Sequence, residues 1–217
     1  TLVVKPVDPE RFFVGSLPVD FLVWDFPRGG WLYDRIRIKD TYADMCKNSI
    51  HLILSRISLD RLSKGKKEYL YHSSYPLTDR MRNRFFTAIG MREWIKVNHH
   101  PQAYTLSNLR ACRELFGDAI TNTSKSRFRK NTDVNQYLYR NYALISGNFY
   151  PYFHGDSFCF VLSSVERYEK TRHNLIEKAF VCLNDSPFLN EEEYPSLKQL
   201  VVRDLEQCLP NKSSFEK

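Results

Sequence analysis

Short apolar runs near both ends of the chain predict buried strands. They lie at residues 2–4, at residues 158–163 (FCFVLS) and at residues 178–183, and their length and β-branched or aromatic content favour strands over helices. The charged segment 165–177 between the last two runs predicts a helix. A further helix is predicted over about 192–209, where three initial glutamates suit the positive end of the helix dipole. Strands that alternate with helices favour an α/β protein with parallel pairing.

The middle of the chain has helical periodicity. Apolar positions predict helices over about 34–62, 78–96, 105–117 and 134–146. Thr105 or Ser107 suits the N-cap of the third helix, and Gly117 predicts its end. We therefore predict an α/β fold in which flanking helices cover a mostly parallel, Rossmann-like sheet. A helix-rich insertion is predicted at about 32–97, and residues 1–217 are expected to belong to one catalytic domain.

Composition narrows the class of protein. The 217 residues are 42% hydrophobic and 26% charged, which is typical of a soluble globular fold and excludes a disordered tail, a collagen-like chain or a coiled coil. The five cysteines contain no C-x-x-C pair, and we interpret them as buried free thiols in a reducing compartment. The sequence contains neither an apolar run of the roughly 18–20 residues that span a bilayer nor a signal peptide. A cytoplasmic location is therefore predicted.

The net charge of +7, from 32 Lys and Arg against 25 Asp and Glu, indicates an anionic partner. Nucleic acid, a membrane surface and a phosphorylated small molecule all fit this charge. The acidic residues are dispersed and the sequence has no nucleic-acid-binding motif. We therefore favour the phosphorylated molecule and expect no nucleic acid as a partner.

The first site candidate is the histidine pair before Pro101. Proline disfavours the helical conformation at its predecessor, and a predicted helix follows. A histidine at this place, His99, can act as a base toward an anionic substrate held at the positive end of the helix. The alternative is an ordinary surface histidine.

A basic loop is the second candidate. Lys125, Arg127, Arg129 and Lys130 fall within six residues, and arginine offers phosphate a planar, bidentate set of donors. The alternatives are a solvated loop or a nucleic-acid contact in which Phe128 stacks on a base. Asp133 is expected either to cap the next helix or to pair with Arg129.

The third candidate is Asn184-Asp185, which ends the second predicted buried strand. Ligands of open α/β sheets bind beyond the carboxyl ends of the strands. A simple turn, which Asn-Asp-Ser-Pro also favours, is the alternative.

Several of these segments resemble the Stealth family of sugar-phosphate transferases. Residues 4–13 (VKPVDPERFF) resemble the end of its second conserved block, and residues 99–101 (HHP) resemble the start of its third. Residues 126–133 (SRFRKNTD) resemble the close of the third block. Residues 182–185 (CLND) and 213–217 (SSFEK) resemble the fourth. The 30 positions from His99 to Arg129 also match the spacing in the animal N-acetylglucosamine-1-phosphotransferase of this family.

The sequence also departs from the family pattern. The first block and the Asn-Asp-Asp of the second block are absent, and residues 24–97 carry no matching motif. Gln102 stands where the animal sequence has a second histidine. We therefore expect the chain to be the C-terminal part of a longer bacterial enzyme and to be inactive alone.

The resemblance implies transfer of a hexose or N-acetylhexosamine 1-phosphate from a UDP-sugar to a saccharide hydroxyl, in capsular or exopolysaccharide synthesis. His99 would be the base, and Arg129 would hold the phosphate. Asp133 would orient Arg129 or contact a sugar hydroxyl. Substrate-binding roles are expected for Arg127, Lys130, Asn184 and Asp185. Mg²⁺ is expected from the family, with Asp185 as one possible ligand.

The expected partners are the UDP-sugar donor, the saccharide acceptor and a membrane-bound polysaccharide-synthesis complex, contacted peripherally at the inner face of the plasma membrane. A conventional glycosyltransferase, an inactive remnant that binds sugar nucleotide, and a nucleic-acid-binding module are the alternatives.

Overall fold

The computed structural model describes residues 2–26, 41–59, 62, 68–92, 94–97, 100–186 and 189–211. These residues divide into two units. Unit 1 lies within Thr1–Asp8, Asn98–Pro101 and His154–Lys217, and unit 2 lies within Pro9–Val97 and Gln102–Phe153. Each unit has its own sheet and its own buried core, so each is described by itself.

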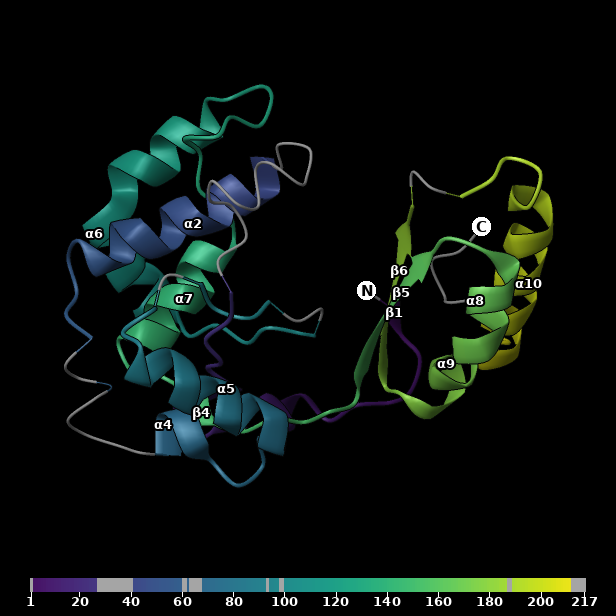
Figure 1. Ribbon diagram of the computed structural model, residues 1–217, viewed down its shortest axis with the longest axis horizontal. Coiled ribbons are helices and arrows are strands. Elements are labelled where there is room, and N and C mark those ends of the chain that lie inside the picture. Colours follow the sequence, from purple (N-terminus) through teal and green to yellow (C-terminus); the bar gives the residue numbers. More distant parts are fainter. Residues whose placement is uncertain are drawn as a thin grey trace. The chain divides into compact units, whose positions relative to one another are not determined.

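Unit 1 is built on three strands. They are β1 (Leu2–Val3), β5 (Ser157–Leu162) and β6 (Phe180–Asp185), in the order β1-β6-β5. Strands β5 and β6 are parallel, with Cys159 opposite Cys182, and β1 pairs antiparallel with β6 (Figure 1). The two longer apolar runs, predicted as buried strands, are thus neighbours in one sheet, although Phe160 is the one residue of β5 that is fully buried.

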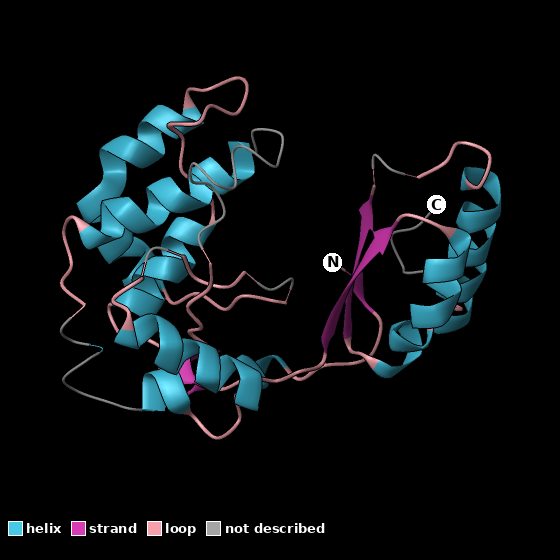
Figure 2. Ribbon diagram, in the orientation of Figure 1, coloured by secondary structure: helices cyan, strands magenta, loops and turns pink. Residues whose placement is uncertain are grey.

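Helices α8 (Val165–Thr171), α9 (His173–Glu177) and α10 (Tyr194–Cys208) lie on one face of this sheet (Figure 2). Ser164 caps α8 by accepting a hydrogen bond from the Arg167 N–H, which satisfies one of the free donors at a helix start. The core of unit 1 contains Val4, Phe160, Tyr168, Leu175, Val181 and Leu197.

Unit 2 holds a smaller sheet that begins after a 3₁₀ turn, Pro9–Phe12. Strands β2 (Phe13–Val14) and β3 (Leu17–Asp20) form a hairpin, and β4 (Tyr150–Pro151) adds to β3 in parallel. Gly15 in the hairpin turn has a φ of 59°, a conformation that costs glycine little.

Helices form most of unit 2. They are α2 (Thr41–Leu54), α4 (Glu68–Tyr71), α5 (Leu77–Ala88), α6 (Leu106–Ser124) and α7 (Tyr137–Ile145). Their shared core includes Leu22, Trp24, Ile50, Ile53, Phe86, Cys112, Phe116, Leu138 and Ile145. No helix in the described ranges is both long and apolar enough to cross a membrane.

The α/β class predicted from the sequence is confirmed, while likeness to a Rossmann fold stays a prediction. Each sheet has one parallel and one antiparallel pairing. The helical segment predicted as an insertion at 32–97 contributes α2, α4 and α5 to the same unit as α6 and α7. A single catalytic domain over 1–217 stays a prediction.

Three predicted helix boundaries were wrong. The helix starting after Thr105 continues past Gly117 to Ser124, with non-helical backbone angles at Phe116. The helix predicted over 78–96 ends at Ala88, where Gly90 has a φ of 72°, and Ile95 instead forms an antiparallel bridge with Trp24. The helix predicted from 134 begins at Tyr137. The helix predicted over 34–62 lies partly outside the described residues.

Candidate functional site

Asp133 closes the basic loop that follows α6. Its carboxylate is 6% exposed and accepts hydrogen bonds from the Ser126 hydroxyl (3.1 Å) and from the Lys130 backbone N–H (2.9 Å). Because α7 begins four residues later, at Tyr137, Asp133 does not cap that helix as one of the predictions had it. Its carboxylate instead fixes the conformation of the loop from inside.

Side chains of α2 and α6 also form hydrogen bonds with this loop. Asn48 on α2 donates to the backbone carbonyls of Asn131 and Asp133, the latter at 3.3 Å. Thr123 on α6 accepts from the Val134 N–H at 3.0 Å. These hydrogen bonds attach the loop to α2 and α6. The exposed side chains of the loop therefore project from a backbone whose conformation is fixed.

The basic side chains of this loop are exposed. Arg127, Arg129 and Lys130 all lie on the surface. The guanidinium carbon of Arg127 lies 5.4 Å from the centroid of the Phe128 ring, which is itself 75% exposed. The predicted phosphate-binding residues are thus brought together on one loop of unit 2, with Asp133 buried beneath them.

Arg129 borders a cavity of about 400 Å³ between α2, α6 and α7. Aromatic and polar side chains share its wall, among them Tyr42, Thr123, Arg129, Asn135, Gln136 and Tyr139. Rings beside amide and hydroxyl groups suit a ligand with both apolar and hydrogen-bonding faces, and the arginine gives one edge of the cavity a fixed positive charge. Burial raises the pKa of Tyr42, so its hydroxyl stays protonated at neutral pH.

The cavity wall is partly preorganised. Asn135 donates to the Cys46 sulfur at 3.2 Å and accepts from the Tyr137 N–H at 3.1 Å, so its amide is already positioned within the protein. These wall residues were not predicted from the sequence, because Tyr42 and Tyr139 come from separate helices and share no motif with Arg129. In the sequence, this region of the protein is marked by the polar segment between α6 and α7.

The histidine predicted as the base, His99, lies outside the described residues. His100 is half-buried and belongs to unit 1, whereas Arg129 and Asp133 belong to unit 2. The catalytic role of His99 therefore stays a prediction.

Asn184 and Asp185 end β6 in unit 1, as predicted. The Asn184 amide donates to the Cys159 sulfur and accepts from the Cys182 thiol, each at 3.3 Å. Burial, together with the neighbouring Cys182, raises the pKa of Cys159 to about 11, which keeps this thiol neutral at pH 7. The Asn184 side chain thus has partners inside the sheet, and the Asp185 side chain lies outside the described residues.

A metal centre is not formed by the described side chains alone. Within the described ranges no group of three or more His, Cys, Asp or Glu residues could hold a metal ion. The expectation of Mg²⁺ stays untested.

A buried ion pair holds the strand end of β3 in unit 2. Arg140 on α7 donates from Nε and Nη2 to the two carboxylate oxygens of Asp20, both at 2.8 Å, and from Nη2 to the Phe21 carbonyl at 3.0 Å. The Arg140 guanidinium also lies 5.3 Å from the Phe21 ring centroid. Asp20 raises the pKa of Arg140 against the opposing effect of burial, so the guanidinium stays charged.

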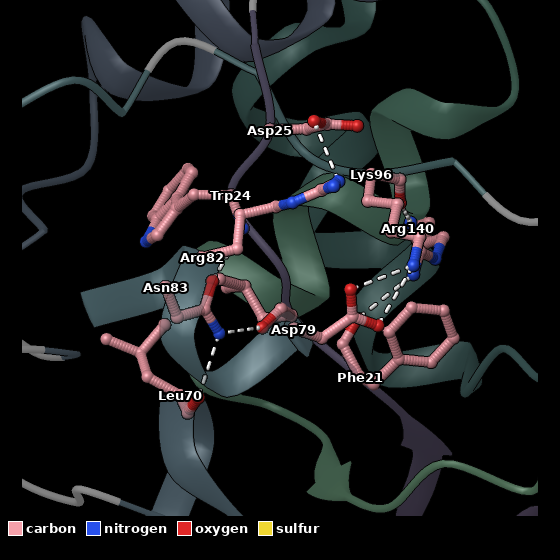
Figure 3. Close-up of polar contacts among 10 residues, drawn as sticks. Phe21, Trp24, Asp25, Leu70, Asp79, Arg82, Asn83, Lys96 and Arg140 are labelled. Atoms are coloured by element: carbon pink, nitrogen blue, oxygen red, sulfur yellow. Dashed lines mark hydrogen bonds and ion pairs between the residues drawn. The ribbon is translucent and has the colours of Figure 1, made fainter. Parts of the chain in front are cut away.

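Polar groups continue from this pair along residues 22–25 (Figure 3). Asn83 on α5 donates to the Leu22 and Leu70 carbonyls, each at 2.8 Å, and accepts from the Trp24 N–H at 2.7 Å. Lys96 pairs with buried Asp79 at 2.9 Å. These side chains are all engaged with the protein itself, which indicates a structural role. The sequence does not single them out, because Asp79 and Asn83 lie in an arginine-rich polar helix.

No protein-family model matches the chain. It is 29% identical over 120 residues to the capsular polysaccharide phosphotransferase WcwK of Streptococcus pneumoniae, and 28% identical over 120 residues to a second protein of that name and species. Each match covers 55% of this chain and 35% of the relative. The chain thus spans about a third of the length of the curated relatives it matches. Membership of the Stealth family stays a prediction.

Proposed function

We propose that this chain is part of a phosphotransferase of capsular or exopolysaccharide synthesis that moves a sugar 1-phosphate from a UDP-sugar to a saccharide hydroxyl. The observation that carries the proposal is the loop closed by Asp133, which presents Arg129 at the edge of the 400 Å³ cavity. The similarity to two capsular polysaccharide phosphotransferases supports the same class of reaction.

The proposed reaction needs no covalent intermediate with the enzyme. The acceptor hydroxyl oxygen bonds to the sugar-bearing phosphorus of the donor, and the bond from that phosphorus to the bridging oxygen breaks. UMP leaves, and the hydroxyl proton passes to a base, for which His99 is the candidate. Such transfer depends mainly on positioning and on neutralising the phosphate oxygens.

Arg129 supplies the charge neutralisation in this proposal, through two parallel N–H donors. Lys130 and Arg127 add positive charge on the same loop, and Asp133 acts through the loop by holding the Lys130 N–H and the Ser126 hydroxyl. Asn184 and Asp185 are proposed to contact the donor or the acceptor, and the aromatic wall of the cavity suits the face of a sugar ring or a base.

The test uses the full-length protein with a panel of UDP-sugars and acceptor saccharides. Phosphorus NMR should show a new phosphodiester signal together with UMP. Release of UDP with a glycosidic product would instead identify a conventional glycosyltransferase, and binding without turnover would identify an inactive remnant. Arg129→Lys should lower turnover by about 10²-fold, because lysine loses the bidentate geometry.

The matched control is Arg113→Lys, at an exposed position of α6 that does not line the cavity. This variant should keep wild-type turnover. Equal activity of the two variants would show that Arg129 does not hold the phosphate. Steeply salt-dependent binding of oligonucleotides that is lost in Phe128→Ala would favour the nucleic-acid alternative, since exposed Phe128 beside Arg127 also suits base stacking.

A further inference from the structure

Two polar residues of helix α5 point inward. Asp79 is 3% exposed and Asn83 is fully buried, and Phe86 lies with them on the buried face. Asp79 pairs with Lys96, and Asn83 holds residues 22–24 and Leu70 (Figure 3). These two buried polar side chains therefore help to fix the fold of unit 2.

The opposite face of α5 is apolar and open. Leu77 and Met81 are each 64% exposed, Phe85 is 53% exposed, and Ile89, directly after the helix, is 50% exposed. Residues four apart lie on one side of a helix, so these four side chains form a row about 18 Å long at a rise of 1.5 Å per residue. Large exposed apolar side chains occur singly on most proteins, whereas a continuous row marks a contact surface.

Positive charge lies beside this row, and the charge of Arg82 is balanced by Asp25, with which it pairs at 2.9 Å. The α5 sequence contains Arg80, Arg82 and Arg84, and its one acidic residue, Asp79, is buried and paired. Arg84 is exposed, while Arg80 and Arg82 are half-buried. Arginine stems can lie along an apolar surface while the guanidinium groups reach outward. We use the name α5 face for this row, which consists of Leu77, Met81, Phe85 and Ile89, together with its flanking arginines.

We propose that the α5 face binds the surface of a membrane that contains anionic lipids. An interfacial helix places apolar side chains at the boundary of headgroups and acyl chains, and its basic residues contact the lipid phosphates. The α5 face has both features on a helix that is already folded by its buried side, so binding needs no ordering of the chain. Methionine, aromatic residues and arginine are also frequent in protein interfaces, so a second copy of the chain is the other occupant that the test distinguishes. The proposal does not depend on the phosphotransferase activity.

The test measures sedimentation of the full-length protein with vesicles of phosphatidylcholine and phosphatidylglycerol. The double variant Met81→Gln/Phe85→Gln should bind at least about tenfold more weakly than the wild type. Arg84→Glu should weaken binding and reduce its salt dependence, and vesicles of phosphatidylcholine alone should bind less protein. Circular dichroism checks that the variants remain folded.

The matched control is Leu115→Gln/Ile176→Gln, which changes two exposed apolar residues on other helices, 43% and 63% exposed. This control should bind vesicles as the wild type does. The proposal is overturned if the α5 and control variants bind equally, or if the wild type does not bind. A dimer that dissociates in Met81→Gln/Phe85→Gln would likewise overturn it and identify a second copy as the partner. The two proposals can fail separately. A protein that binds vesicles but shows no transferase activity would contradict only the proposed function, and a protein that is active but does not bind vesicles would contradict only the membrane proposal.

Discussion

Arg140 holds both carboxylate oxygens of Asp20, with Nε and Nη2 each 2.8 Å from its partner oxygen. The side chains are 1% and 10% exposed, so both charges are largely removed from water. Because Asp20 ends β3 and Arg140 lies on α7, this pair joins the small sheet of unit 2 to its helices. A buried ion pair is costly to break, since the remaining charge is left without a partner.

Asp20→Asn should therefore destabilise the protein by about 3–5 kcal/mol. Urea denaturation at pH 7 measures the change in the free energy of unfolding. The control is Glu166→Gln, whose pair with Lys170 is 78% and 71% exposed. An exposed pair contributes little to stability, because water and salt screen its charges. Equal effects of the two variants would show that the Asp20 pair does not stabilise unit 2.

Asn83→Asp tests whether the buried amide organises the segment after β3. The substitution keeps the size of the side chain and an acceptor for the Trp24 N–H, but it removes both donors to the Leu22 and Leu70 carbonyls. Two buried carbonyls without partners should cost about 2–5 kcal/mol in unfolding free energy.

The control for this variant is Asn190→Asp. The Asn190 side chain accepts a hydrogen bond from the Glu192 N–H at an exposed position, and aspartate keeps that acceptor. Its effect should stay within about 0.5 kcal/mol. A loss in Asn83→Asp no larger than this would contradict the role assigned to the amide.

Local patterns predicted much of the fold. The apolar runs predicted β5 and β6, which pair in parallel, but β5 is less buried than expected, with Phe160 its one buried residue and Val161 42% exposed. Of the two predicted helix caps, Thr105 and Ser107, Thr105 is the one observed, since its hydroxyl accepts a hydrogen bond from the Asn108 N–H. Gly117 was predicted as the end of this helix but follows a kink within it, since Phe116 has non-helical backbone angles and helical structure resumes as far as Ser124.

The candidate site was predictable only in part. The clustered arginines of the loop were visible in the sequence, but the role of Asp133 was not, since its partners Ser126 and Lys130 are set by the fold of the loop. Nor could the sequence show that Asp20 pairs with Arg140, 120 residues away. Contacts at such separations depend on how the helices pack, and no single-sequence pattern encodes them.

Asp133→Asn and Arg129→Ala should separate support of the loop from binding of phosphate. Asp133→Asn weakens the two hydrogen bonds that close the loop, so it should lower the free energy of unfolding by about 1–3 kcal/mol and also lower turnover. Arg129 is exposed, so Arg129→Ala should lower turnover while changing stability by less than about 0.5 kcal/mol. Thermal denaturation and the UMP-release assay measure both quantities. A strong stability loss in Arg129→Ala would contradict its assignment as a binding residue.

The protein should lose stability as the pH rises above about 9. Burial raises the pKa of Cys112 from 9.0 to about 12 and that of Tyr104 from 10.0 to about 12. Between the ordinary and the raised pKa, the unfolded chain loses a proton that the folded protein keeps. The unfolded state then binds fewer protons, so stability is complete below the ordinary pKa and declines as the pH rises toward 12.

The variant Cys112→Val tests whether the buried thiol contributes to this loss of stability at high pH. Valine has no proton to lose in either state, so the variant should show a shallower decline between pH 9 and 11, by up to about 1.4 kcal/mol per pH unit. Urea denaturation of both proteins at pH 7.5, 9 and 10 gives the two slopes, and the value at pH 7.5 removes any packing cost of the substitution. Tyr104→Phe should reduce the slope at a slightly higher pH, because its ordinary pKa is higher. An unchanged slope in Cys112→Val would show that the buried thiol does not resist ionisation in the folded protein.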